Sequence, residues 1–258
     1  AINAAGDHDE IIVAPGTYSE CEDTINYFTA VMNPLGKRLW IHSSGGADVT
    51  IIDANKCHAG IFSSGETTGL VIEGFTFTST TENMWPIHMF LSATTFRDCV
   101  FTGGGSNGAA YCRRGVPEFE GCIFTNNAVA VTLSDWQGYG EYYGTAKFTN
   151  CTFRNNTDGG SSEGTAIYMT DGMDLELSNC LFENNSGSAI IYTSSEYTDS
   201  VITDCVFRNN DASGGTFDGI IFQTFHSGNL NMQGCLFENN SAVHQLLFGE
   251  FFENFAYL

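Results

Sequence analysis

Basic residues are scarce in this chain of 258 residues, which has 9 lysines and arginines against 30 aspartates and glutamates. The net charge of −21 repels nucleic-acid phosphates and anionic membrane surfaces, so we expect neither as a partner. No apolar run reaches the roughly 18 residues that a membrane-spanning helix needs, and the first residues lack the pattern of a secretion signal. We therefore expect no membrane insertion of this chain.

Proline is also scarce, with 4 residues, whereas glycine (29) and phenylalanine (21) are abundant. This composition predicts many short strands joined by tight turns, and thus an all-β protein. The nine cysteines are an odd number, so at least one thiol is free or paired with another molecule. No Cys-x-x-Cys pair is present, and if any bridge exists we expect it between Cys21 and Cys57.

One short motif, [Asp/Asn/Gly]-Cys-x-Phe, followed in most copies by x-Asn-Asn, recurs along the chain. Its six copies are Asp98–Gly104, Gly121–Asn127, Asn150–Asn156, Asn179–Asn185, Asp204–Asn210 and Gly234–Asn240. This spacing predicts a solenoid in which each repeat stacks on the one before it. We expect a single domain over 1–258, with a cap and first coils in 1–60, regular coils in 70–240, and a last coil or C-terminal interface in 241–258.

The cysteine and phenylalanine of each motif are two residues apart, so on a strand both point into the core. Stacked turns lie about 4.8 Å apart, which predicts columns of cysteine, phenylalanine and asparagine along the solenoid. The residue after each phenylalanine faces outward, and its charge alternates in the last four repeats (Arg154, Glu183, Arg208, Glu238). Opposite charges on neighbouring strands favour this register.

A second outward column is mostly apolar. It contains Val100, Ile123, Thr152, Leu181, Val206 and Leu236. An apolar column of this length is a candidate assembly stripe, formed by Val100, Ile123, Leu181, Val206 and Leu236. The alternative is the ordinary β-propensity of a strand surface.

The opening stretch AINAAGDHDEIIVAPGTYSE, residues 63–78 and the Cys-x-Phe-x-Asn-Asn repeats resemble right-handed parallel β-helix proteins of the pectate-lyase-like superfamily. The tetrads FTNN, FRNN and FENN are similar to the FxxN repeats of polymorphic outer-membrane-protein-type (FxxN/GGAI) passengers. This resemblance implies a β-helix, and the second family implies an adhesive surface protein. A full GGAI is absent.

Candidate catalytic motifs are incomplete, and we assign no catalytic, cofactor-binding or metal residues. A uronate lyase needs a basic residue near calcium-binding carboxylates, and Arg113-Arg114 is a basic pair outside the repeats. Asp158, Asp171 and Asp174 lie in stretches similar to a polygalacturonase element but also fit turns. Bound Ca²⁺ is the one cofactor that we keep open.

We expect a non-catalytic extracellular β-helix that acts as a structural or adhesive element of a cell surface, sheath or filament. The alternative is a polysaccharide lyase or epimerase, or a glycan-binding module, on the same scaffold. The candidate glycan contacts are Trp136, Tyr139, Tyr142 and Tyr143. Candidate N-glycosylation sites in Asn-x-Ser/Thr triplets are Asn150, Asn155, Asn184 and Asn239. The expected partners are other protein subunits, including copies of this chain, or surface glycans.

Overall fold

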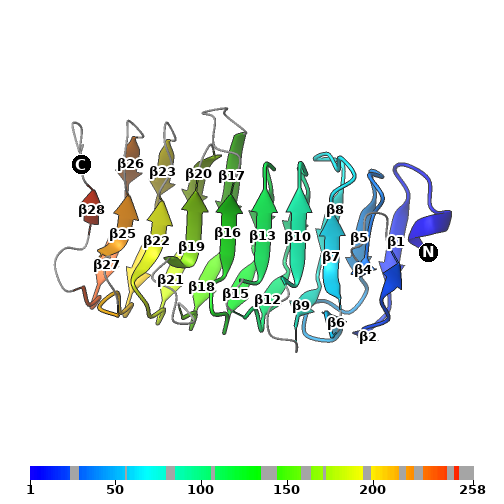
Figure 1. Cartoon of the computed structure of the whole chain (residues 1–258), viewed down its shortest axis with the longest axis horizontal. Helices are drawn as coiled ribbons and strands as arrows, with labels where there is room; N and C mark the ends of the chain where they lie inside the picture. The colour runs from blue at the N-terminus through cyan, green and yellow to red at the C-terminus, as the bar shows by residue number, and fades with distance from the viewer. Residues whose placement is uncertain are drawn as a thin grey trace.

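The computed structural model describes residues 1–23, 29–55, 57–79, 85–105, 108–134, 144–157, 164–170, 173–193, 199–214, 219–223, 229–242 and 247–249. Within these ranges the regular elements are β-strands, apart from the short 3-10 helix η1 (Ile2–Ala4). The strands stack into a rod with the N-terminus at one end (Figure 1). No helix in the described ranges is long and apolar enough to cross a membrane. The predicted all-β solenoid is confirmed.

Each turn of the solenoid contributes one strand to each of three sheets. Sheet A contains β1 (Glu10–Val13), β5 (Trp40–Ser43), β8 (Val71–Glu73), β11 (Thr95–Arg97), β14 (Glu118–Glu120), β17 (Gly144–Thr149), β20 (Met173–Ser178), β23 (Ser200–Thr203) and β26 (Leu230–Gln233). Sheet B contains β2 (Gly16–Tyr18), β6 (Thr50–Asp53), β9 (Thr76–Thr78), β12 (Val100–Thr102), β15 (Ile123–Thr125), β18 (Thr152–Arg154), β21 (Leu181–Glu183), β24 (Val206–Arg208) and β27 (Leu236–Glu238).

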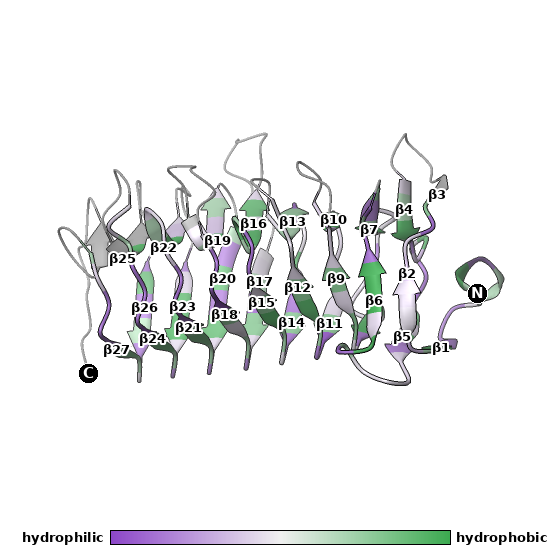
Figure 2. Ribbon diagram, turned by 90° about the horizontal axis from the view of Figure 1, so that it is seen from below, coloured by the Kyte–Doolittle hydropathy of each residue, from purple (hydrophilic) through white to green (hydrophobic). Residues whose placement is uncertain are grey.

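Sheet C occupies the third side. It contains β3 (Glu22–Asp23), β4 (Thr29–Met32), β7 (His58–Phe62), β10 (Ile87–Phe90), β13 (Ala110–Arg113), β16 (Val131–Ser134), β19 (Gly164–Thr170), β22 (Ala189–Thr193), β25 (Gly219–Gln223) and β28 (Leu247–Gly249). The strands of all three sheets pair in parallel, except for β3, which pairs antiparallel with β4 at one edge of sheet C. Buried and more exposed residues alternate along strands such as β20, and Figure 2 shows both hydrophobic and hydrophilic residues on the strands.

The core is built from columns of identical side chains. The phenylalanines of sheet B form an uninterrupted stack from Phe77 to Phe237, with ring centroids 4.6 to 5.5 Å apart. Phe96, Phe119 and Phe148 of sheet A meet several of these rings edge-on. These contacts confirm the predicted phenylalanine column and bury the apolar surface that stabilises the rod.

The asparagine pairs at the end of sheet B have two roles. The first asparagine of each pair, such as Asn155, is exposed and left-handed, with a φ of 54°. The second is buried and donates its amide to the Oδ1 of the next, from Asn127 to Asn156 at 3.0 Å and from Asn156 to Asn185 at 2.9 Å. The predicted asparagine ladder is therefore confirmed, and the second asparagine of each pair builds it.

The cysteine column lies in the core beside the phenylalanine stack. Five of its six thiols donate to a carbonyl of the preceding turn, as from Cys151 to Phe119 at 3.3 Å, whereas Cys205 donates to Thr203 two residues before it. Seven cysteines in the described chain are free, and Cys21 and Cys57 form the expected bridge. Burial raises the pKa of Cys112 to about 12 and also raises the pKa of Cys122.

Native thiols should therefore resist alkylation. In a neutral iodoacetamide reaction followed by mass spectrometry, we expect Cys112 and Cys122 to stay unmodified until urea unfolds the chain. The half-buried Cys235 should react first. Rapid labelling of Cys122 in the native protein would contradict the burial of this column.

Candidate functional site

The connections between strands have a constant length at one edge of the solenoid and a variable length at the other two. From β8 onward, each connection from sheet A to sheet B is two residues long, such as Asp98–Cys99. The connections that enter and leave sheet C vary in length from turn to turn. In repeat proteins, insertions that collect around one face often mark the binding face. Sheet C, which crosses the middle of Figure 1, is therefore the first surface to consider.

The outward side of sheet C carries a column of aromatic side chains. The strand register aligns His88 of β10 with Tyr111 of β13, then Thr132, Tyr168 and Tyr192 on the following strands. All five side chains are half-buried. The rings of Tyr168 and Tyr192 lie 5.4 Å apart. The alternate residues of the same strands, such as Ile87 and Met89, fill the core.

Four rings gather at one end of this column. Trp85 stacks on Tyr111 with a centroid distance of 4.5 Å and on His88 at 5.6 Å. His88 in turn lies 5.7 Å from Tyr111 and 5.5 Å from His58. His58 is buried and its Nδ1 lies 2.8 Å from the carbonyl of Trp85. We call Trp85, His88, Tyr111 and His58 the sheet C ring cluster.

Both histidines of the ring cluster favour the neutral form. The pKa of His88 is lowered to about 4, mainly by burial and to a smaller extent by the nearby His58 and Arg113. Burial also lowers the pKa of His58, against the opposing effect of its hydrogen bond to Trp85. At neutral pH the cluster therefore presents uncharged rings with polar edges.

Arg113 borders the ring cluster on the same outward side. It pairs in register with Phe90, and its guanidinium carbon lies 5.7 Å from the centre of that ring. Arg113 follows Tyr111 by two positions on β13, so both side chains face away from the core. The structure thus places Arg113 beside aromatic side chains. Arg114 lies in the turn after β13, with a φ of 54°.

The predicted glycan contacts lie elsewhere in the sequence. Trp136, Tyr139, Tyr142 and Tyr143 fall outside the described residues, and so does Asp158 and Asp171. The four aromatic residues fall in the sequence between β16 of sheet C and β17 of sheet A. Asp174 is described and lies in strand β20, so the expectation that it is a turn residue is wrong; its Oδ1 accepts a hydrogen bond from the backbone N–H of Asp199 in the next coil at 2.7 Å.

Sheet B carries the other predicted residues. The assembly stripe forms one outward column in continuous register (Val100, Ile123, Thr152, Leu181, Val206, Leu236). Five of its members are half-buried, and Leu236, at 47% exposure, is the most exposed. In the neighbouring charged column, Glu183 and Arg208 form the expected ion pair at 2.8 Å.

The four candidate glycosylation sites flank the same sheet. Asn150 precedes β18, whereas Asn155, Asn184 and Asn239 follow β18, β21 and β27. All four are exposed and left-handed, with φ between 53° and 56°. Their side chains are accessible to modification, but a glycan at these turns would stand beside the assembly stripe.

A polar cluster on sheet A involves Trp40. Its indole N–H donates to Glu73 at 3.0 Å, and its ring stacks on His42 at 4.2 Å. His42 in turn contacts Glu10 at 2.8 Å. Trp40 is 43% exposed, but its polar atom is already satisfied within the sheet. This cluster supplies a matched control for the rings of sheet C.

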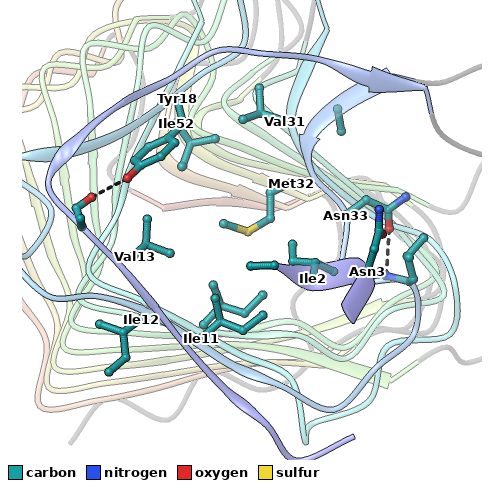
Figure 3. A pocket seen from close by; sticks show the side chains of 15 residues that line it. Ile2, Asn3, Ile11, Ile12, Val13, Tyr18, Val31, Met32, Asn33 and Ile52 are labelled. Carbon is teal, nitrogen blue, oxygen red and sulfur yellow. Dashed lines mark hydrogen bonds between the residues drawn. The ribbon is translucent and has the colours of Figure 1, made fainter. Parts of the chain in front are cut away.

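The open end of the core forms a cavity of about 540 Å³ beneath η1 and the first strands. Ile2, Ile11, Val13, Met32 and Ile52 line it, as Figure 3 shows. Lys37 holds η1 over the opening by donating to the carbonyls of Ile2 and Ala5, at 2.7 and 2.8 Å. The lining is the continuation of the apolar core, so the cavity is the end of the solenoid.

No group of three or more His, Cys, Asp or Glu that suits a metal occurs in the part of the chain that the structure describes. The ring cluster was missed by sequence reasoning because its histidines lie at irregular separations. Counting from the second asparagine of each motif does not align His88, Tyr111, Tyr168 and Tyr192 either, because the connections from sheet B to sheet C differ in length.

Comparison with known proteins agrees with this architecture. The family model described as "Right handed beta helix region" matches residues 138–250. The chain is a right-handed parallel β-helix. A solved structure described as pectin methylesterase from carrot is similar at a TM-score of 0.42 and 13% identity, over 89% of this chain and 77% of that one. Comparison with curated proteins finds no match. The resemblance of the repeats to FxxN/GGAI passengers stays a prediction.

Proposed function

We propose that this β-helix is a non-catalytic extracellular adhesive element of a cell surface, sheath or filament, and that it binds glycans on sheet C. The observation that carries the proposal is the ring cluster, in which Trp85, His88 and Tyr111 stack on the outward side of the sheet. Half-buried aromatic rings held by a rigid scaffold supply binding area at low entropic cost.

An extracellular location is supported by two features. The Cys21–Cys57 bridge is typical of oxidising compartments, and the four Asn-x-Ser/Thr asparagines are exposed. If they are glycosylated, their glycans would obstruct self-assembly through the stripe on sheet B. Three of them, Asn155, Asn184 and Asn239, lie in the connections that lead from sheet B to sheet C.

Removal of one ring tests the binding face. On a glycan array, Tyr111→Ala should weaken binding at least about tenfold, because a central stacking ring is lost. Tyr111→Phe keeps the ring and should retain most of the affinity, and Trp40→Ala on sheet A should bind like the native chain. Binding that survives in Tyr111→Ala but disappears in Trp40→Ala would move the binding face to sheet A and overturn the proposal.

A further inference from the structure

The distribution of acidic residues singles out sheet C. From β4 to β28 its strands contain no aspartate or glutamate, although the chain carries 30 of them. The outward columns of sheets A and B contain several, among them Glu118, Glu120, Glu176, Glu183 and Glu238. On a chain with a net charge of −21, this face therefore repels an anion least.

Arg113 stands out among the basic side chains of the described residues. Four others are paired with carboxylates, at 2.7 to 3.8 Å: Arg38 with Asp7, Arg97 with Glu120, Lys147 with Glu176, and Arg208 with Glu183. Arg113 has no carboxylate partner among the described residues, and its Nε is buried without a hydrogen-bond acceptor there. Arg154 also lacks an ion pair within the described ranges, but it is exposed to water.

The Nε of Arg113 is buried, so an anion that approaches along sheet C would meet the terminal nitrogens of the guanidinium. The planar guanidinium matches a carboxylate or a sulfate with two parallel hydrogen bonds. The ring of Phe90 beneath Arg113 limits the directions that the side chain takes. The group is thus preorganised for an anion that approaches along sheet C.

The rings and the guanidinium lie within reach of one sugar. Tyr111 and Arg113 are two residues apart on β13, so their Cα atoms lie about 7 Å apart along the strand. His88 and Phe90 repeat this pair on β10. A sugar ring in contact with the ring cluster would extend an exocyclic acidic group toward Arg113.

On the basis of the proposed function, we infer that sheet C binds glycans that carry a carboxylate or a sulfate, with Arg113 as the ligand of the anionic group. Sparse acidic groups on an otherwise neutral glycan suit this face better than a dense polyanion, which the net charge of the chain repels. Neither the rings nor Arg113 alone would give this selectivity.

The test compares acidic glycans with their neutral counterparts on one array, with sialyllactose, sulfated lactose and lactose as one matched set. The native chain should prefer acidic members, and the two acidic forms distinguish carboxylate from sulfate. Arg113→Gln should weaken acidic binding about tenfold or more and leave neutral binding unchanged. Arg113→Lys should recover part of the loss, and Arg154→Gln, which removes an unpaired charge on sheet B, should have no effect.

The outcomes separate this inference from the proposed function. Equal binding of neutral and acidic members, or Arg113→Gln binding like the native chain, would overturn the anionic ligand but leave glycan binding on sheet C in place. Binding to no glycan on the array would overturn both. Thermal melts of each variant show whether a loss of binding comes from unfolding.

Discussion

Replacement of Asn156 by alanine should destabilise the solenoid by about 3–5 kcal/mol, one of the largest effects of any single substitution. Asn156 is fully buried, and its Oδ1 accepts from the backbone N–H and the side-chain amide of Asn127, at 3.2 and 3.0 Å. Its own amide donates to the carbonyl of Phe124 at 3.1 Å and to Asn185 at 2.9 Å. Alanine leaves buried donors and acceptors without partners in two turns.

The measurement is urea unfolding followed by circular dichroism. The matched control is Asn155→Gly, one residue earlier, because glycine adopts the left-handed backbone of this exposed position without strain. We expect the control to change the free energy of unfolding by less than about 1 kcal/mol. Equal losses in the two variants would mean that the buried ladder contributes no more than the turn itself.

Acidification should destabilise the chain through His88, by up to about 3 kcal/mol. Burial lowers the pKa of His88 from 6.5 to about 4, with smaller contributions from His58 and Arg113. Above pH 6.5 both the folded and the unfolded state hold neutral His88, so the stability is complete. Between pH 6.5 and about 4 the unfolded state binds the proton first, and the folded state loses stability as the pH falls.

The urea midpoint measured at a series of pH values tests this prediction. His88→Phe keeps a ring in the stack with Trp85 and Tyr111 but cannot be protonated, so its midpoint should depend less on pH in this window. Trp40→Phe on sheet A, which changes a ring that carries no titratable group, is the control and should keep the native dependence. If His88→Phe and the native chain show the same slope, the burial of His88 does not determine the acid response.

The sequence predicts the solenoid scaffold but not the ring cluster on sheet C. In every copy of the motif the cysteine and the phenylalanine are two residues apart, as Cys99 and Phe101 are. The two columns therefore follow from counting residues along the sequence. The connections into sheet C change length, and the same counting fails to align His88 with Tyr111. The predicted aromatic contacts at Trp136 and Tyr139 came from local composition, which does not report which strands lie side by side.

The sequence by itself determined the parallel solenoid, the inward columns of phenylalanine, cysteine and asparagine, and the alternating charges of Glu183 and Arg208. Each of these follows from a short motif whose spacing is constant, because identical turns place identical side chains above one another. Only the tertiary structure decided that Trp85 lies on Tyr111 and that Arg113 has no carboxylate beside it in the described chain. Those contacts join residues of different turns across connections of unequal length, and their geometry depends on the path of the backbone rather than on local pattern.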